Sequence, residues 1–167
     1  REGIKFANEI LKSNKDIIIF QEPEKIDLIK HYPDIVRTID KTIDKTTIKS
    51  LLCILSRNIT LFKQTYPIEQ YHSEMFGNLL IQNLTNTKFD WFFGPFLFTK
   101  NLSKYWLKYD TYELWEAQVI PCIDCINNKE IKVIDYKVSF KYPILQKKKE
   151  EQNIIFIEKR LYQLNRI

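Results

Sequence analysis

Two cysteines, Cys122 and Cys125, have the spacing typical of a metal or redox site. A structural zinc site needs four ligands, usually two such pairs, and a thioredoxin-like site needs its pair at the start of a helix. The other candidate ligands are scattered along the chain: His31, Cys53 and His72. Asn127 and Asn128 indicate a hairpin turn soon after the pair. Cys122 and Cys125 are therefore the best metal candidates in the chain, but we expect them to be ordinary thiols near a strand end.

The carboxylate considered for catalysis is Glu74, on a helix predicted from Glu69 to Asn83. His72 and Glu74 are two residues apart, so their side chains point about 200° apart around a helix and do not converge on a metal. Tyr71 and Glu74 are three residues apart and share a face. A lone helical glutamate is more often a solvated or ion-paired surface group than a ligand.

An uncharged run rich in aromatic residues extends from Trp91 to Phe98. Such side chains could line a pocket for a long apolar pigment, form a docking surface for a partner, or fill a core. Core is the expectation for Trp91, because Gly94-Pro95 suits the end of a helix. We expect Phe96 and Phe98 to belong to a docking patch. The full set of candidates for pigment binding or partner docking is Trp91, Phe92, Phe93, Phe96, Phe98, Trp106 and Trp115.

The composition limits the function classes. The chain has 167 residues, with 26 Lys and Arg against 21 Asp and Glu, and its excess of lysine and isoleucine is typical of an AT-rich coding genome. The net charge of +5 is therefore a poor indicator of nucleic-acid binding, which we do not expect. Lysines interleaved with aromatic residues from 100 to 109 leave a ribosomal or ribonucleoprotein subunit as an alternative.

Several common sequence signatures are missing from the chain. It has no phosphate-binding loop, serine-hydrolase elbow or zinc-protease helix motif, so nucleotide hydrolysis and serine hydrolysis are not expected. No run approaches the roughly 20 apolar residues of a membrane-spanning helix. We therefore expect a soluble protein or one that associates peripherally with a membrane.

Helical patterns dominate residues 1–99. Apolar residues at a spacing of three and four predict a helix over Glu2 to Asn14, and Pro23 and Pro33 each open a further helix. Asp16 to Phe20 is a short apolar segment. A helix capped by Thr46 or Thr47 is predicted next, with a buried stripe that comprises Ile48, Leu51, Leu52 and Leu55.

Residues 112–167 have a different character, rich in β-branched and aromatic side chains. Strands are predicted over Tyr112 to Ile123, Glu130 to Leu145 and Asn153 to Leu164, with a solvated loop over Gln146 to Gln152. The expected fold is α+β, a helical half followed by a small antiparallel sheet, in a single domain over residues 1–167. Residues 100–128 are expected to be an insertion particular to this chain.

A family resemblance rests on the order of several short segments. These are Glu2-Gly3-Ile4, the Leu51-Leu52 region, the segment from Tyr66-Pro67 to Glu74, Trp91-x-x-Gly94-Pro95 and the final segment from Ile155 to Leu164. In this order they resemble the plastid and cyanobacterial β-carotene isomerase family of the strigolactone pathway. In that family's frame Glu74 matches a glutamate that would be catalytic or would bind iron. Arg160 stands where the family has a cysteine, and the family's cysteine-rich segment has no counterpart before Ile167.

The resemblance implies a plastid protein, in the stroma or on the stromal face of the thylakoid. Because the cysteines are missing, we expect a non-catalytic isomerase-like accessory subunit of a large photosynthetic or thylakoid assembly. Such a subunit would bind other subunits of the complex, and a carotenoid or chlorophyll is a conceivable ligand. The alternative within the family is an active carotenoid cis/trans isomerase, with iron as its cofactor.

Overall fold

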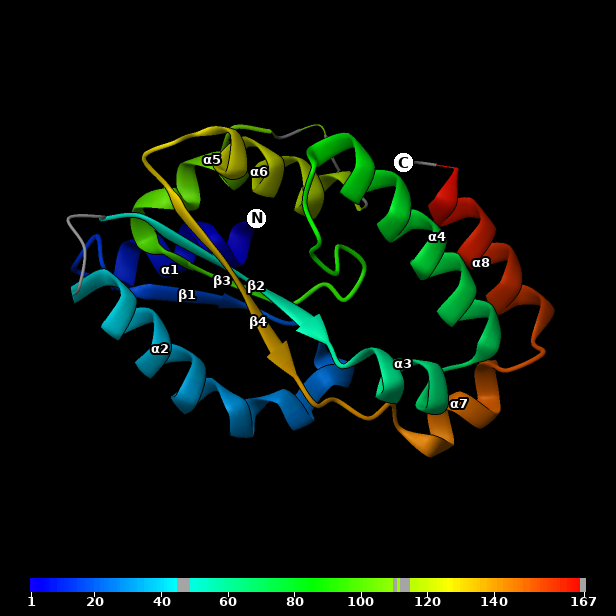
Figure 1. Ribbon diagram of the computed structural model, residues 1–167. Coiled ribbons are helices and arrows are strands. Elements are labelled where there is room, and N and C mark those ends of the chain that lie inside the picture. Colours follow the sequence, from blue (N-terminus) through cyan, green and yellow to red (C-terminus); the bar gives the residue numbers. More distant parts are fainter. Residues whose placement is uncertain (45–48, 110, 112–114, 166–167) are drawn as a thin grey trace. The chain divides into compact units, whose positions relative to one another are not determined.

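The computed structural model describes residues 1–44, 49–109, 111 and 115–165 (Figure 1). Two 3₁₀-helices, η1 and η2, join the α-helices and strands. The elements follow in this order: α1 (Glu2–Ile10), β1 (Ile17–Phe20), η1 (Pro23–His31), α2 (Tyr32–Asp44), β2 (Leu51–Arg57), α3 (Ile59–Thr65), α4 (Ile68–Thr85), β3 (Phe96–Thr99), η2 (Lys100–Leu102), α5 (Ser103–Leu107), α6 (Glu116–Asn127), β4 (Lys132–Val138), α7 (Ile144–Glu150) and α8 (Ile154–Leu164).

The strands form one sheet in the order β1-β3-β2-β4. β3 is antiparallel to both neighbours, with Phe98 opposite Ile18 on one side and Leu52 on the other. β4 runs in the same direction as β2, as the arrows in Figure 1 show. The α+β class is therefore confirmed, but the sheet is mixed and not purely antiparallel.

The chain divides into two compact units. Unit 1 comprises Arg1–Leu55 and Gly94–Tyr136, and unit 2 comprises Ser56–Phe93 and Lys137–Ile167. The assignment of the whole chain to a single domain stays a prediction.

Part of the core of unit 1 is a sheet face covered by aromatic side chains, beside buried aliphatic residues such as Leu28, Ile35 and Ile39. The indole of Trp106 on α5 stacks on Phe98, with ring centroids 4.1 Å apart, and on Phe96, at 5.1 Å. Phe96 also stacks on Phe20 of β1 at 5.0 Å. Residues 100–128, expected to be an insertion, thus supply Trp106 to this core.

In unit 2, local capping signals define where helices begin. Asn58 accepts hydrogen bonds from the backbone N–H groups of Thr60 and Leu61 and starts α3. Asn153 does the same for Ile155 and Phe156 and starts α8. Such caps stabilise a helix by about 1 kcal/mol. α4 and α8 lie side by side, as Figure 1 shows.

The predicted helix after Thr46 and Thr47 is wrong over its described part, which is strand β2. Residues 45–48, with both candidate caps and Ile48, lie outside the described residues. All seven residues of β2 are buried, so apolar side chains occupy both faces of the strand. A strand of this kind has no alternating pattern, and leucines at 51, 52 and 55 then resemble a helical stripe.

Two of the three strands predicted after residue 112 are helices. Asn153 to Leu164 forms α8 and not a strand, because the Asn153 cap and the burial of Phe156 outweigh the β propensity of its isoleucines. The described part of Tyr112 to Ile123 belongs to helix α6, and 112–114 lie outside the described residues. The predicted hairpin tip at Asn127 and Asn128 is the end of α6.

Two other predictions in this region are partly right. Within Glu130 to Leu145 only β4 is a strand, and the predicted loop over Gln146 to Gln152 is largely helix α7. The predicted helix over Glu69 to Asn83 is confirmed as α4. None of the helices in the described part of the chain combines the length and apolar character that crossing a membrane requires.

Candidate functional site

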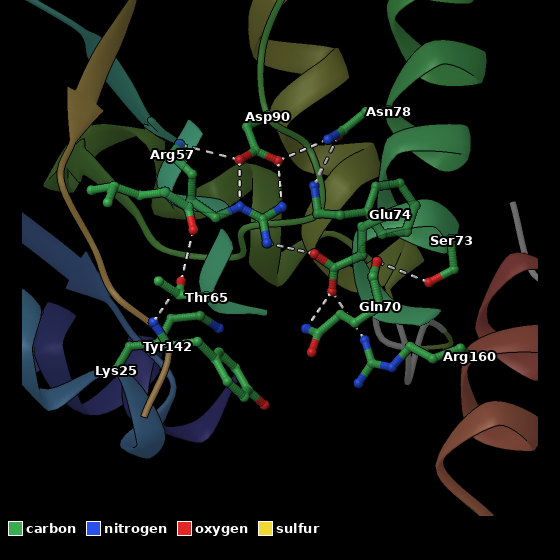
Figure 2. A network of polar contacts seen from close by, with 12 residues as sticks. Lys25, Arg57, Thr65, Gln70, Ser73, Glu74, Asn78, Asp90, Tyr142 and Arg160 are labelled. Atoms are coloured by element: carbon green, nitrogen blue, oxygen red, sulfur yellow. Dashed lines mark hydrogen bonds and ion pairs between the residues drawn. The ribbon is translucent and has the colours of Figure 1, made fainter. Parts of the chain in front are cut away.

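A buried ion-pair network lies within unit 2, and its centre is Arg57 at the end of β2 (Figure 2). The Arg57 guanidinium binds the Asp90 carboxylate with two hydrogen bonds, from Nε to Oδ2 at 2.7 Å and from Nη2 to Oδ1 at 2.8 Å. The backbone N–H of Arg57 donates to the same carboxylate at 3.2 Å. This bidentate geometry fixes both the distance and the orientation of the two groups.

Glu74 on α4 joins two arginines. Its Oε2 accepts a hydrogen bond from Nη1 of Arg57 at 2.6 Å, and its Oε1 accepts one from Nη1 of Arg160 at 3.0 Å. The side-chain amide of Gln70 also donates to Oε1, at 2.7 Å. Both oxygens of the carboxylate are therefore engaged, and Arg160 ties α8 to α4.

The network is deeply buried and electrically balanced. The side chains of Arg57 and Glu74 are only 1% and 3% exposed. Two arginines face two carboxylates, so the charges cancel. The Arg57 guanidinium also lies 3.5 Å from the ring centroid of Phe62, a cation–π contact on the apolar side. A buried pair of this kind costs several kcal/mol when one partner is removed, because a charge is left without compensation.

Asn78 connects the network to the loop that carries the aromatic run. Its side-chain N–H donates to Asp90 Oδ1 at 2.8 Å, and its carbonyl oxygen accepts from the backbone N–H of Phe92 at 3.2 Å. The backbone N–H of Asp90 donates to the hydroxyl of Ser56 at 3.2 Å. These bonds place residues 90–92 against α4 and the end of β2.

The electrostatics keep the network charged. Burial alone would raise the pKa of Asp90, but the charge and hydrogen bonds of Arg57 hold that pKa below its ordinary value. For Arg57 burial acts to lower the pKa, and Asp90 and Glu74 together raise it well above its ordinary value. Burial also raises the pKa of the neighbouring Tyr66. Asp90 and Arg57 are thus a stable ion pair at neutral pH and not a proton-transfer pair.

A small pocket borders the network. Its lining comprises Ser73, Glu74, Phe92, Arg160, Gln163 and Leu164, and its free volume of about 10 Å³ holds about one water molecule. The buried Nε of Arg160 has no hydrogen-bond partner, so a water in this pocket would satisfy it. A polyene pigment does not fit in this volume.

The predicted aromatic candidates fall into both units. Trp91, Phe92 and Phe93 are buried in unit 2, in agreement with the expectation of core for Trp91. Phe96 and Phe98 are buried in unit 1 and stack on Trp106, so the expectation that they form a docking patch is not met. Their stacking on the sheet is what removes them from solvent. Trp115 is partly exposed.

The cysteine pair lies within helix α6 and not near a strand end. Burial raises the pKa of Cys125 to about 12 and that of Cys122 well above its ordinary value. Thiols of this kind stay protonated and bind metal poorly. In the part of the chain that the structure describes, no cluster of His, Cys, Asp or Glu has the geometry of a metal site.

On α4 several polar side chains are buried and several apolar side chains are exposed, the reverse of the usual pattern, which we call the inverted pattern of α4. The polar residues Gln70, Glu74 and Asn78 are buried at 7% exposure or less. The opposite face carries four exposed apolar residues, which we call the α4 apolar stripe: Phe76 (55% exposed), Leu79 (53%), Leu80 (40%) and Leu84 (82%). An exposed apolar stripe on a helix whose polar side chains are inside is typical of an interaction surface.

Sequence reasoning found Glu74 but missed Arg57 and Arg160 as its partners. Arg57 is the last residue of the apolar strand β2. A charged side chain at the end of a buried strand indicates that the side chain has a buried partner of opposite charge. Asp90 immediately precedes the aromatic run, but nothing in its spacing identifies Arg57 as its partner.

Comparisons of the chain with protein-family models, with curated proteins and with solved structures find no match. The resemblance to the β-carotene isomerase family therefore rests on the sequence motifs alone.

Proposed function

We propose that the protein is a non-catalytic, isomerase-like accessory subunit of a large plastid assembly, and that it binds this assembly through the α4 apolar stripe. The observation that carries this proposal is the inverted pattern of α4. Three of its polar side chains, Gln70, Glu74 and Asn78, are buried inside unit 2, and the four apolar side chains of the stripe point to solvent.

The geometry of the stripe is that of a helix that docks in a groove. Phe76, Leu79, Leu80 and Leu84 follow the spacing i, i+3, i+4 and i+8, which places them along one side of the helix. α4 has 18 residues and is therefore about 27 Å long. Its two acidic residues are Glu69 and the buried Glu74, and it has no lysine or arginine, so the partner surface is expected to be apolar.

The role of Glu74 supports a non-catalytic protein. A carboxylate that acts as a base or an iron ligand needs a free oxygen, but Glu74 uses both oxygens for Arg57, Arg160 and Gln70. The iron-dependent isomerase alternative requires Glu74 to leave these partners. The ribonucleoprotein alternative is also weakened, because Trp106 of the lysine-rich and aromatic segment 100–109 is buried on Phe96 and Phe98 and is not free to stack on bases.

The experiment compares the native chain with a stripe variant, Phe76→Ser/Leu80→Ser, expressed in the source plastid. A matched control is Ile26→Ser/Ile29→Ser, which changes two apolar residues of η1 that are 66% and 56% exposed. We expect the native chain and the control to migrate with a large complex on a high-salt sedimentation gradient, and the stripe variant to migrate alone.

Circular dichroism and thermal unfolding establish that both variants are folded. A folded stripe variant that stays with the complex would contradict a docking role for α4. A native chain found outside plastids would contradict the plastid assembly.

A further inference from the structure

The net charge of the chain is distributed unequally between the two units. Unit 1 has 15 Lys and Arg and 15 Asp and Glu, whereas unit 2 has 11 Lys and Arg and 6 Asp and Glu. The entire net charge of +5 therefore belongs to unit 2. Within unit 2, Arg57 and Arg160 are balanced by Glu74 and Asp90, so the surplus comes from other basic residues.

Helix α7 presents part of this surplus beside apolar side chains. Ile144 and Leu145 are 72% and 77% exposed, and Lys148 and Lys149 are also exposed. Lys148 follows Ile144 by four residues and Lys149 follows Leu145 by four, so all four side chains share the outward face of the helix. No residue of α7 is buried.

Helix α8 repeats the arrangement in part. Ile154 and Ile155, at 65% and 72% exposure, are followed one turn later by exposed Lys159 but also by exposed Glu158, where α7 has two lysines. Tyr162 extends this outward face with 57% exposure. We call the two outward faces together the α7–α8 surface, which has three lysines and one glutamate and is defined as Ile144, Leu145, Lys148, Lys149, Ile154, Ile155, Glu158, Lys159, Leu161 and Tyr162.

The inward sides of both helices are held in place. The Tyr142 hydroxyl donates to Glu150 at 2.5 Å, and the Gln146 amide donates to the same carboxylate at 3.0 Å. The backbone N–H of Gln152 donates to Glu69 on α4 at 3.0 Å. Arg160 on α8 donates to Glu74 on α4 at 3.0 Å, so bonds on the inward side hold both helices while Ile144, Ile154 and Ile155 are exposed.

We propose that the α7–α8 surface binds an anionic lipid membrane. Aliphatic side chains at the start of a helix, with lysines one turn later on the same face, fit the boundary between acyl chains and headgroups. The lysine stems lie along the apolar region while the ammonium groups reach acidic headgroups. The tyrosine suits the same boundary. The charge of unit 2 is complementary to such a membrane and unit 1 contributes none.

Other occupants fit this surface less well. Single-stranded nucleic acid is bound by exposed aromatic platforms and arginines, whereas this surface has aliphatic residues, lysines, a single tyrosine and no arginine. A second copy of the chain packed on this surface would offer only Glu158 to pair with three lysines. The inference goes beyond the proposed function, because the surface uses α7 and α8 and not the α4 apolar stripe.

The test is co-sedimentation of the full chain with lipid vesicles. Vesicles of phosphatidylcholine alone are compared with vesicles of phosphatidylcholine and phosphatidylglycerol in equal parts. We expect binding to the anionic vesicles that weakens with added salt. Lys148→Gln/Lys149→Gln should lower the partition coefficient at least tenfold, since each lysine near an anionic surface contributes about 1 kcal/mol. Ile144→Ser/Ile155→Ser should lower it on anionic vesicles as well.

The matched charge control is Lys12→Gln/Lys15→Gln, which removes two exposed lysines from unit 1 and should leave binding unchanged. The Phe76→Ser/Leu80→Ser variant should also bind vesicles normally, which separates this proposal from the proposed function. The proposal is overturned if the native chain does not bind anionic vesicles, or if Lys12→Gln/Lys15→Gln lowers binding as much as Lys148→Gln/Lys149→Gln does. It is also overturned if Lys148 and Lys149 instead support binding to single-stranded RNA.

Discussion

The carboxylate of Asp90 faces the guanidinium of Arg57 across two parallel hydrogen bonds, of 2.7 and 2.8 Å. Residues 33 positions apart in the sequence are thereby joined in the interior of unit 2. Glu74 completes the environment of Arg57 from α4, at 2.6 Å. The stability of unit 2 should therefore depend on this one arginine.

Replacement of Arg57 by methionine should destabilise the protein strongly. The variant keeps much of the side-chain volume but leaves Glu74 and Asp90 as buried charges with fewer partners, which costs about 3–5 kcal/mol. Urea unfolding measures the free energy of unfolding. Arg37→Met is the control, because Arg37 pairs with Asp34 on the surface and is 70% exposed. It should cost less than about 1 kcal/mol. Equal effects of the two substitutions would contradict the structural role of Arg57.

The charge balance of the network predicts a compensating pair of substitutions. Glu74→Gln should destabilise the protein because Arg160 then loses its carboxylate partner and Arg57 keeps only Asp90. Adding Arg160→Gln to Glu74→Gln restores neutrality, so the double variant should be more stable than the sum of the single effects by about 0.5–3 kcal/mol. A double-mutant cycle in urea measures this coupling, and strictly additive effects would show that Arg160 and Glu74 do not interact.

The depressed pKa of Asp90 predicts how stability changes with acid. A carboxylate with a folded-state pKa below its unfolded value of about 3.9 stabilises the fold above that value. This contribution is lost as the pH falls through the folded-state pKa. The free energy of unfolding should therefore decrease below about pH 4, and less steeply in Asp90→Asn. Asp27→Asn, at an exposed carboxylate, is the matched control for the substitution itself. If the free energy of unfolding of Asp90→Asn depended on pH as that of the native chain does, the lowered pKa of Asp90 would be contradicted.

Gly94 and Gly3 should respond to alanine in opposite directions. Gly94 has a φ of +97°, and a Cβ there would collide with the carboxylate of Glu22 within unit 1. Gly94→Ala should cost more than about 1 kcal/mol. Gly3 lies in α1 with open space around it, so Gly3→Ala should stabilise the helix by about 0.5–1 kcal/mol. Thermal unfolding measures both, and a neutral Gly94→Ala would contradict the close approach of Glu22.

The cysteines should be unreactive in the folded protein. Cys53, Cys122 and Cys125 are buried, and burial raises the pKa of each thiol. A thiol reagent at pH 8 should modify none of them until denaturant is added. Rapid modification of Cys122 or Cys125 under native conditions would contradict their burial and favour a redox or metal-binding role for the pair.

The sequence predicts the fold class and α4, but not which residues contact one another. The helix from Glu69 to Asn83 was predictable because its length excludes a strand. β2 was not, because a strand buried on both faces lacks alternation. α8 was not, because isoleucine-rich segments favour strands locally, and the cap at Asn153 together with packing against α4 decides the outcome. Glu74 was predicted as a candidate, but its pairing with Arg57 depends on the tertiary fold.

The most direct test of the central claim is sedimentation of the native protein from an extract of its source cells at high salt, with metal analysis of the same fractions. The proposed accessory role predicts that the protein migrates with a much larger complex and without an equivalent of iron. A chain that migrates alone with one equivalent of iron would contradict it and favour an active isomerase.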